Sequence, residues 1–95
     1  MKILAIEKEN PGVTKELIKP LLKEEAKKVW ELVQSGIIRE ISFTKDEHCA
    51  VIILECEDGD EAKSILNTLP LVKERLISFE ITPLVPYDGF ERLFI

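Results

Sequence analysis

Proton-transfer chemistry is available to four candidate catalytic side chains in this sequence: Glu40, Glu80, Arg39 and His48. Moving a proton beside a carbonyl needs a base with a pKa raised toward neutrality and a cation or hydrogen-bond donor that stabilises the developing enolate. A glutamate reaches such a pKa when it is desolvated or lies near a second carboxylate. Histidine is the usual proton shuttle near neutral pH, and His48 stands beside Asp46 and Glu47.

Each candidate also has a purely structural interpretation, and the sequence leaves both open. Glutamates on edge strands are commonly solvated charges that prevent edge-to-edge aggregation. In the structural interpretation, Arg39 forms a salt bridge to a helix glutamate. His48 is then simply an exposed side chain, as histidines in hairpin turns commonly are. Nucleophilic catalysis is not indicated, because Ser42 and Ser78 have no adjacent histidine.

The apolar periodicity indicates the elements that must position these residues. It predicts a strand over 2–7, a helix over 14–35, strands over 37–44 and 48–57, a short helix over 58–69 and a strand over 75–82. Pro20 predicts a kink or a separate first turn in the long helix, and Pro70 predicts the end of the short helix. Pro83 and Pro86 predict that the last strand stops before them.

This order is the split βαβ pattern of a ferredoxin-like domain. The predicted fold class is therefore α+β, a single ferredoxin-like βαββαβ domain over residues 1–95, with a four-stranded antiparallel sheet and two helices on one face.

Alternation assigns the residues of the sheet to its two faces. The residues expected beneath the helices are Ile37, Arg39, Ile41, Phe43, Ile77, Phe79 and Ile81. The third strand is apolar on both sides, with Cys49, Val51 and Ile53 on one face and Ala50, Ile52 and Leu54 on the other. The helix-free face therefore has an apolar middle, which is typical of an interface or a ligand groove.

A homodimer would cover that apolar middle. Two sheets facing each other would close a dimeric α/β barrel around a cavity. The polar residues expected to line it are Glu40, Glu80 and the candidate ligand-binding residues Ser42, Ser78 and Thr82.

The charge balance disfavours two classes of partner. Eighteen acidic and thirteen basic residues give a net charge of −5, which repels nucleic acid phosphates and anionic lipid. The first apolar run is interrupted by Glu7, too early for a signal peptide or a membrane span, so a cytoplasmic protein is expected.

The metal and redox chemistry of the chain is limited. Cys49 and Cys56 lie seven residues apart on one predicted strand, beyond disulfide reach, and we expect reduced thiols. With a single histidine, no metal site is expected within one chain. The abundance of Lys, Glu, Ile and Leu, with Gln34 the only glutamine, resembles the composition of thermophile proteins.

Several segments together resemble a known family. They are Glu25-Ala26-Lys27-Lys28 through Gly36-Ile37-Ile38-Arg39, the hairpin, Leu69-Pro70-Leu71, and the strand that closes in Pro83-Leu84. Over residues 20–88 the chain resembles the muconolactone isomerase-like branch of the dimeric α/β-barrel superfamily. The resemblance implies an enzyme that moves a proton and a double bond within an unsaturated lactone, without metal or organic cofactor, in a ring of subunits. It also places Arg39, Glu24 and Glu25 where the family carries an arginine and acidic residues. From the residues alone, Glu24 and Glu25 are most simply solvated helix glutamates.

The predicted function is a cofactor-independent isomerase-like enzyme that acts on a small anionic carbonyl or lactone metabolite in the dimer-barrel cavity. The alternative is a non-catalytic oligomeric protein that binds a small ligand or serves assembly on the same scaffold. The apolar residues Phe90, Leu93, Phe94 and Ile95 predict that the tail over 84–95 docks on a neighbouring subunit.

Overall fold

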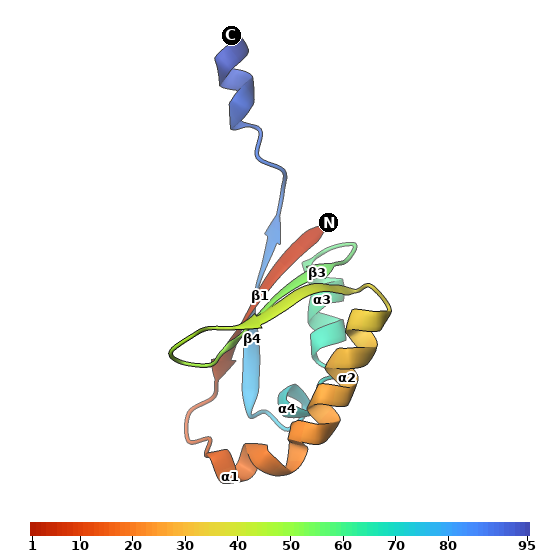
Figure 1. Cartoon of the computed structure of the whole chain (residues 1–95), viewed down its shortest axis with the longest axis vertical. Coiled ribbons are helices and arrows are strands. Elements are labelled where there is room, and N and C mark those ends of the chain that lie inside the picture. Colours follow the sequence, from red (N-terminus) through yellow and green to blue (C-terminus); the bar gives the residue numbers. More distant parts are fainter.

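Four antiparallel strands form the sheet of this protein, and the helices pack against one of its faces (Figure 1). The computed structural model describes all 95 residues. The strands are β1 (Lys2–Glu9), β2 (Ile38–Phe43), β3 (Ala50–Glu55) and β4 (Ile77–Leu84). Their order across the sheet is β2-β3-β1-β4, so β1 and β3 are central and β2 and β4 are edges. This is the ferredoxin-like arrangement, and it confirms the predicted fold class.

The helical segments are α1 (Lys15–Ile18), η1 (Lys19–Leu21), α2 (Leu22–Gln34), α3 (Gly59–Leu66), α4 (Pro70–Lys73) and η2 (Gly89–Phe94). Pro20 lies in η1, the 3₁₀ turn between α1 and α2. Because proline has no N–H, the α-helical ladder cannot run through it, and the predicted separate first turn is confirmed. Gly36 follows α2 with φ +83°, the left-handed conformation that commonly ends a helix.

Two predictions about prolines are wrong. The short helix α3 begins after Asp58, whose Oδ1 accepts a 2.8 Å hydrogen bond from Glu61 N, but it ends at Leu66, before Pro70. Pro70 instead begins α4, where a first-turn residue needs no N–H donor. The last strand runs through Pro83 to Leu84, because β4 pairs with β1 alone and its free edge tolerates a missing donor.

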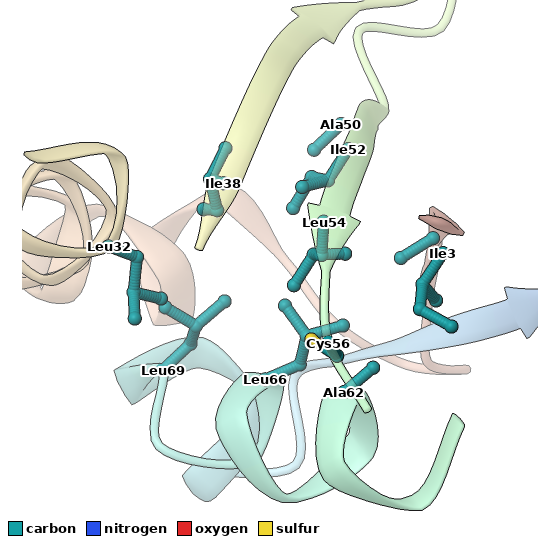
Figure 2. Packing of buried hydrophobic residues seen from close by; sticks show 11 residues of the cluster. Ile3, Leu32, Ile38, Ala50, Ile52, Leu54, Cys56, Ala62, Leu66 and Leu69 are labelled. Atoms are coloured by element: carbon teal, nitrogen blue, oxygen red, sulfur yellow. The ribbon is translucent and has the colours of Figure 1, made fainter. Parts of the chain in front are cut away.

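The core lies between the sheet and α3, with contributions from α2 and the segment before α4. Figure 2 shows Ile3 and Leu54 of the sheet above Ala62 and Leu66 of α3. The fully or nearly fully buried cluster comprises Ile3, Ala5, Leu32, Ile38, Ala50, Ile52, Leu54, Cys56, Ala62, Leu66 and Leu69. The inward set predicted for β4 is confirmed by the buried Ile77 and the partly buried Phe79 and Ile81. For β3, where the sequence left the inward face open, Ala50, Ile52 and Leu54 pack into the core.

The predicted alternation of β2 is wrong at its start. The register with β3 shifts between Ile38 and Glu40, so the strand contains an irregularity of the bulge type. Ile38 is therefore buried in the core, Ile37 is partly buried against it, and Phe43 lies on the helix side as predicted. Arg39 is exposed, and its Nε donates a 2.6 Å hydrogen bond to Gly36 O at the end of α2, not to a helix glutamate.

The C-terminal tail projects away from the sheet beyond the end of β4 (Figure 1). Phe90, Leu93, Phe94 and Ile95 expose most of their surface. None of the helices is both long enough and apolar enough to cross a lipid bilayer.

Candidate active site

A cavity of about 840 Å³ lies between α2 and the helix-covered face of the sheet. Fourteen of its 21 lining residues are hydrophobic, among them Val29 of α2, Ile52 of β3 and Phe79 of β4. Ala26 and Ala50 also line it, and side chains this small leave space unfilled between α2 and the sheet. An apolar hollow of this size, with a few polar groups, is the usual form of a small-molecule site.

Two of the four carboxylates that line this cavity, Glu7 and Glu25, accept backbone hydrogen bonds. Glu7 follows Ile3 and Ala5 at intervals of two on β1, so strand alternation places it on the helix-covered face. Its Oε1 accepts a 3.0 Å hydrogen bond from Ala50 N. Glu25 of α2 accepts a 3.0 Å hydrogen bond through its Oε1 from Leu71 N. Backbone donors from β3 and from α4 therefore hold the two carboxylates.

The environment of Glu25 raises its affinity for a proton. Burial raises the pKa of Glu25 above its ordinary value of 4.5, the hydrogen bond from Leu71 N lowers it, and the charge of Glu7 raises it again. The net shift is upward. A glutamate shifted in this direction is suited to general acid–base catalysis.

His48 lies at the same cavity, beside Glu47. Its ring stacks on Phe43, with centroids 3.9 Å apart and an angle of 17° between the planes. The backbone of His48 has φ +57°, and its N–H donates a 3.1 Å hydrogen bond to Thr44 O. Stacking and the tight turn together orient this imidazole.

Only two of the residues proposed from the sequence line the cavity: His48 and Ser42. Strand pairing places Ser78, Glu80 and Thr82 opposite Lys8, Ile6 and Leu4 on the helix-free face. Glu40 is exposed on β2 and does not line the cavity either. Their assignment to a site between two sheets stays a prediction, because it depends on a second copy of the chain.

The surroundings of Glu80 shift its pKa in the opposite direction from that of Glu25. Its Oε2 lies 2.8 Å from Lys8 Nζ, and both side chains are exposed. The hydrogen bond and the positive charge of Lys8 lower the pKa of Glu80 below its ordinary value of 4.5. In the single chain, Glu80 is therefore held as a carboxylate and is a weak base.

The sequence analysis did not identify Glu7 as a site residue. From the residues alone it assigned Glu25 to the solvated side of the helix, and only the family resemblance pointed to an acidic residue at that position. The signal for Glu7 was a carboxylate continuing the inward-facing series of Ile3 and Ala5. No comparable local signal existed for Glu25, because its partner Leu71 is distant in the sequence. No group of three or more His, Cys, Asp or Glu side chains is arranged to hold a metal ion.

Comparisons with known proteins agree with this fold. A comparison with curated protein sequences gave no significant match. A solved structure, 5-chloro-2-hydroxyhydroquinone dehydrochlorinase from Burkholderia phenoliruptrix AC1100 in complex with 2,5-dihydroxybenzoquinone, superposes with a TM-score of 0.72. It shares 18% sequence identity, and the alignment covers 94% of this chain and 98% of that one. The sequence profile of muconolactone delta-isomerase matches residues 5–89. This chain therefore belongs to the muconolactone delta-isomerase family.

Proposed function

We propose that this protein is a cofactor-independent isomerase that moves a proton within a small carbonyl compound or unsaturated lactone bound between α2 and the sheet. Such a reaction conserves every atom and the overall oxidation state, so acid–base groups suffice for it. The carrying observation is Glu25, a carboxyl group with a raised pKa beside Glu7 in an apolar cavity. Membership of the family supports the same class of reaction.

Glu25 is the proposed proton carrier. It takes a proton from the carbon beside the carbonyl and, after its carboxyl proton has exchanged with water, gives one proton back to another carbon of the same molecule. Glu7 raises the proton affinity of Glu25 through its negative charge. His48 is the proposed donor to the substrate carbonyl oxygen, where charge develops as the proton leaves. Ser42 is a further proposed ligand contact.

The test compares two adjacent glutamates. Glu25→Gln removes the proton carrier but keeps the size of the side chain and an oxygen that can accept from Leu71 N. Glu24→Gln makes the same change of charge at an exposed neighbour on α2 and is the matched control. Incubation with a panel of unsaturated lactones in D₂O, followed by NMR, detects deuterium entering the ligand. The rate with Glu25→Gln should fall by about 10²-fold or more, while Glu24→Gln should stay near the wild-type rate.

Two outcomes contradict this proposal. If Glu25→Gln exchanges as fast as the wild-type protein, Glu25 is not the proton carrier. If the wild-type protein binds a lactone without exchanging any of its protons, a non-catalytic ligand-binding protein is the better interpretation.

We further propose that the working unit is a homodimer paired through the helix-free face of the sheet. Leu4, Ile6, Val51 and Ile53 provide the apolar middle of this face, and Ile6 exposes 37% of its surface. Pairing two such faces would remove this apolar surface from water. Glu40, Ser78, Glu80 and Thr82 would then lie around the space between the sheets. The sequence suggested these four residues together with Ser42.

A further inference from the structure

The charged side chains that line the cavity between α2 and the sheet are mostly acidic. Glu7 and Glu9 come from β1, Glu25 from α2 and Glu47 from the β2–β3 turn. Lys15 is the only lysine among the lining residues. The cavity lining therefore contains four carboxylates and a single ammonium group.

No arginine balances these carboxylates. Arg39, Arg75 and Arg92 are all absent from the cavity lining. The Nε of Arg39 is already bound to Gly36 O. Carboxylate ligands are commonly recognised by paired hydrogen bonds from a guanidinium group, and the cavity offers none.

The carboxylates of Glu7 and Glu25 would repel an anionic ligand. Glu7 and Glu25 lie among apolar walls, where like charges repel more strongly than in water. Their influence on each other is already visible, since the charge of Glu7 raises the pKa of Glu25. A negative charge on the ligand would be repelled by both groups and would find few polar groups able to solvate it.

We infer that this cavity selects an uncharged carbonyl ligand, such as a neutral lactone or a hydroxylated carbonyl compound without a carboxylate. The inference rests on the proposed function of the cavity and revises the anionic substrate expected from the sequence. Apolar walls bind the body of such a ligand, and the carboxylates accept hydrogen bonds from its hydroxyl groups. The charge of the ligand is thereby a determinant of specificity.

The test uses two ligands that differ only in charge. An unsaturated γ-lactone with an acetic acid side chain is compared with its primary amide, which has nearly the same shape. Trp30 reports binding, because it is the only tryptophan and lines the cavity. Titrations of Trp30 fluorescence at about pH 8 keep the acid ligand ionised. The amide should bind about tenfold more tightly than the acid, and salt at about 0.5 M should narrow the difference.

Two glutamine variants show whether the lining carboxylates cause the discrimination. Glu47→Gln removes a lining carboxylate that has no part in the proposed proton transfer. It should strengthen binding of the acid about threefold and have little effect on binding of the amide. Glu57→Gln makes the same change of net charge outside the cavity lining, and it should leave both affinities unchanged.

The outcomes separate this inference from the proposed function. Acid binding as tight as amide binding overturns the inference alone. Amide binding without deuterium exchange contradicts the proposed isomerase but supports the selection of an uncharged ligand. Binding of neither compound overturns both.

Discussion

Glu25 on α2 accepts a hydrogen bond from the backbone N–H of Leu71 on α4, with 3.0 Å between Oε1 and N, although the two residues are 46 positions apart in the chain. Leu71 is buried, and both residues line the cavity. The bond therefore ties two of its walls together. The carboxyl group proposed for catalysis therefore also makes a tertiary contact between α2 and α4.

Replacement of this carboxyl group should change stability in a pH-dependent way. Glu25 has a folded-state pKa above its ordinary value of 4.5, so the folded protein holds this proton more tightly than the unfolded chain. The resulting stabilisation is complete below the unfolded pKa and is lost as pH rises through the folded pKa. Glu25→Gln, which resembles the protonated acid, should therefore melt at a higher temperature than wild type at neutral pH. Below about pH 4 the two melting temperatures should converge. Thermal unfolding by circular dichroism across this range checks the sign, and a lower Tm for Glu25→Gln at neutral pH would contradict it.

His48 can be removed without disturbing its backbone. Asparagine tolerates positive φ better than most residues, so His48→Asn suits the observed φ of +57°. Loss of the imidazole should lower kcat by about 10²-fold, with a smaller change in KM, if it stabilises charge in the transition state. Steady-state kinetics on a turned-over lactone measure this. A pure KM effect would show that His48 only binds the ligand.

The ion pair with Lys8 should make the contribution of Glu80 to stability depend on pH in the opposite direction from that of Glu25. Since Lys8 lowers the pKa of Glu80, the stabilisation from this carboxylate is present above the unfolded pKa and is lost as pH falls through the folded pKa. Lys8→Gln should move the NMR titration midpoint of the Glu80 carboxyl carbon upward. The midpoint of exposed Glu16 on α1 serves as control and should not move. An unchanged Glu80 midpoint would show that the pair does not persist in solution.

The tail over 84–95 remains a predicted oligomerisation element. Phe94 is 85% exposed and Ile95 fully exposed, and solvated apolar surface of this kind commonly marks an interface. Truncation after Gly89 should lower the oligomeric state or the solubility, measured by gel filtration with light scattering. Wild-type protein that is monomeric at micromolar concentration would refute the proposed homodimer, and an unchanged assembly after truncation would refute the role of the tail.

The core beneath α3 should be sensitive to truncation of a side chain. Leu66 exposes 1% of its surface and packs in the same cluster as Ile3 and Leu54. Leu66→Ala should cost about 2–5 kcal/mol of unfolding free energy, through lost burial and the cavity left behind. Asn67→Ala, at the exposed helix end, is the control for urea unfolding. Equal unfolding midpoints would contradict the packing described here.

The sequence by itself determined the order of the elements and much of their orientation. Pro20 had to interrupt the α-helical ladder, and the alternation of Ile77, Phe79 and Ile81 had to place one side of β4 beneath the helices. Such features follow from the covalent limits of one residue or from the period of a strand. They depend on neighbours within a few positions of the chain.

The tertiary structure alone decided where the cavity lies and which carboxylates enter it. The shift in register near Arg39 arises from pairing with β3, and it moved Ile38 inward while leaving Arg39 in solvent. Glu7 and Glu25 line the same cavity only because the fold brings α2 over the helix-covered face of the sheet. Burial and charge then change the pKa of Glu25 through space, and the distances that govern these effects are not encoded in any local pattern of residues.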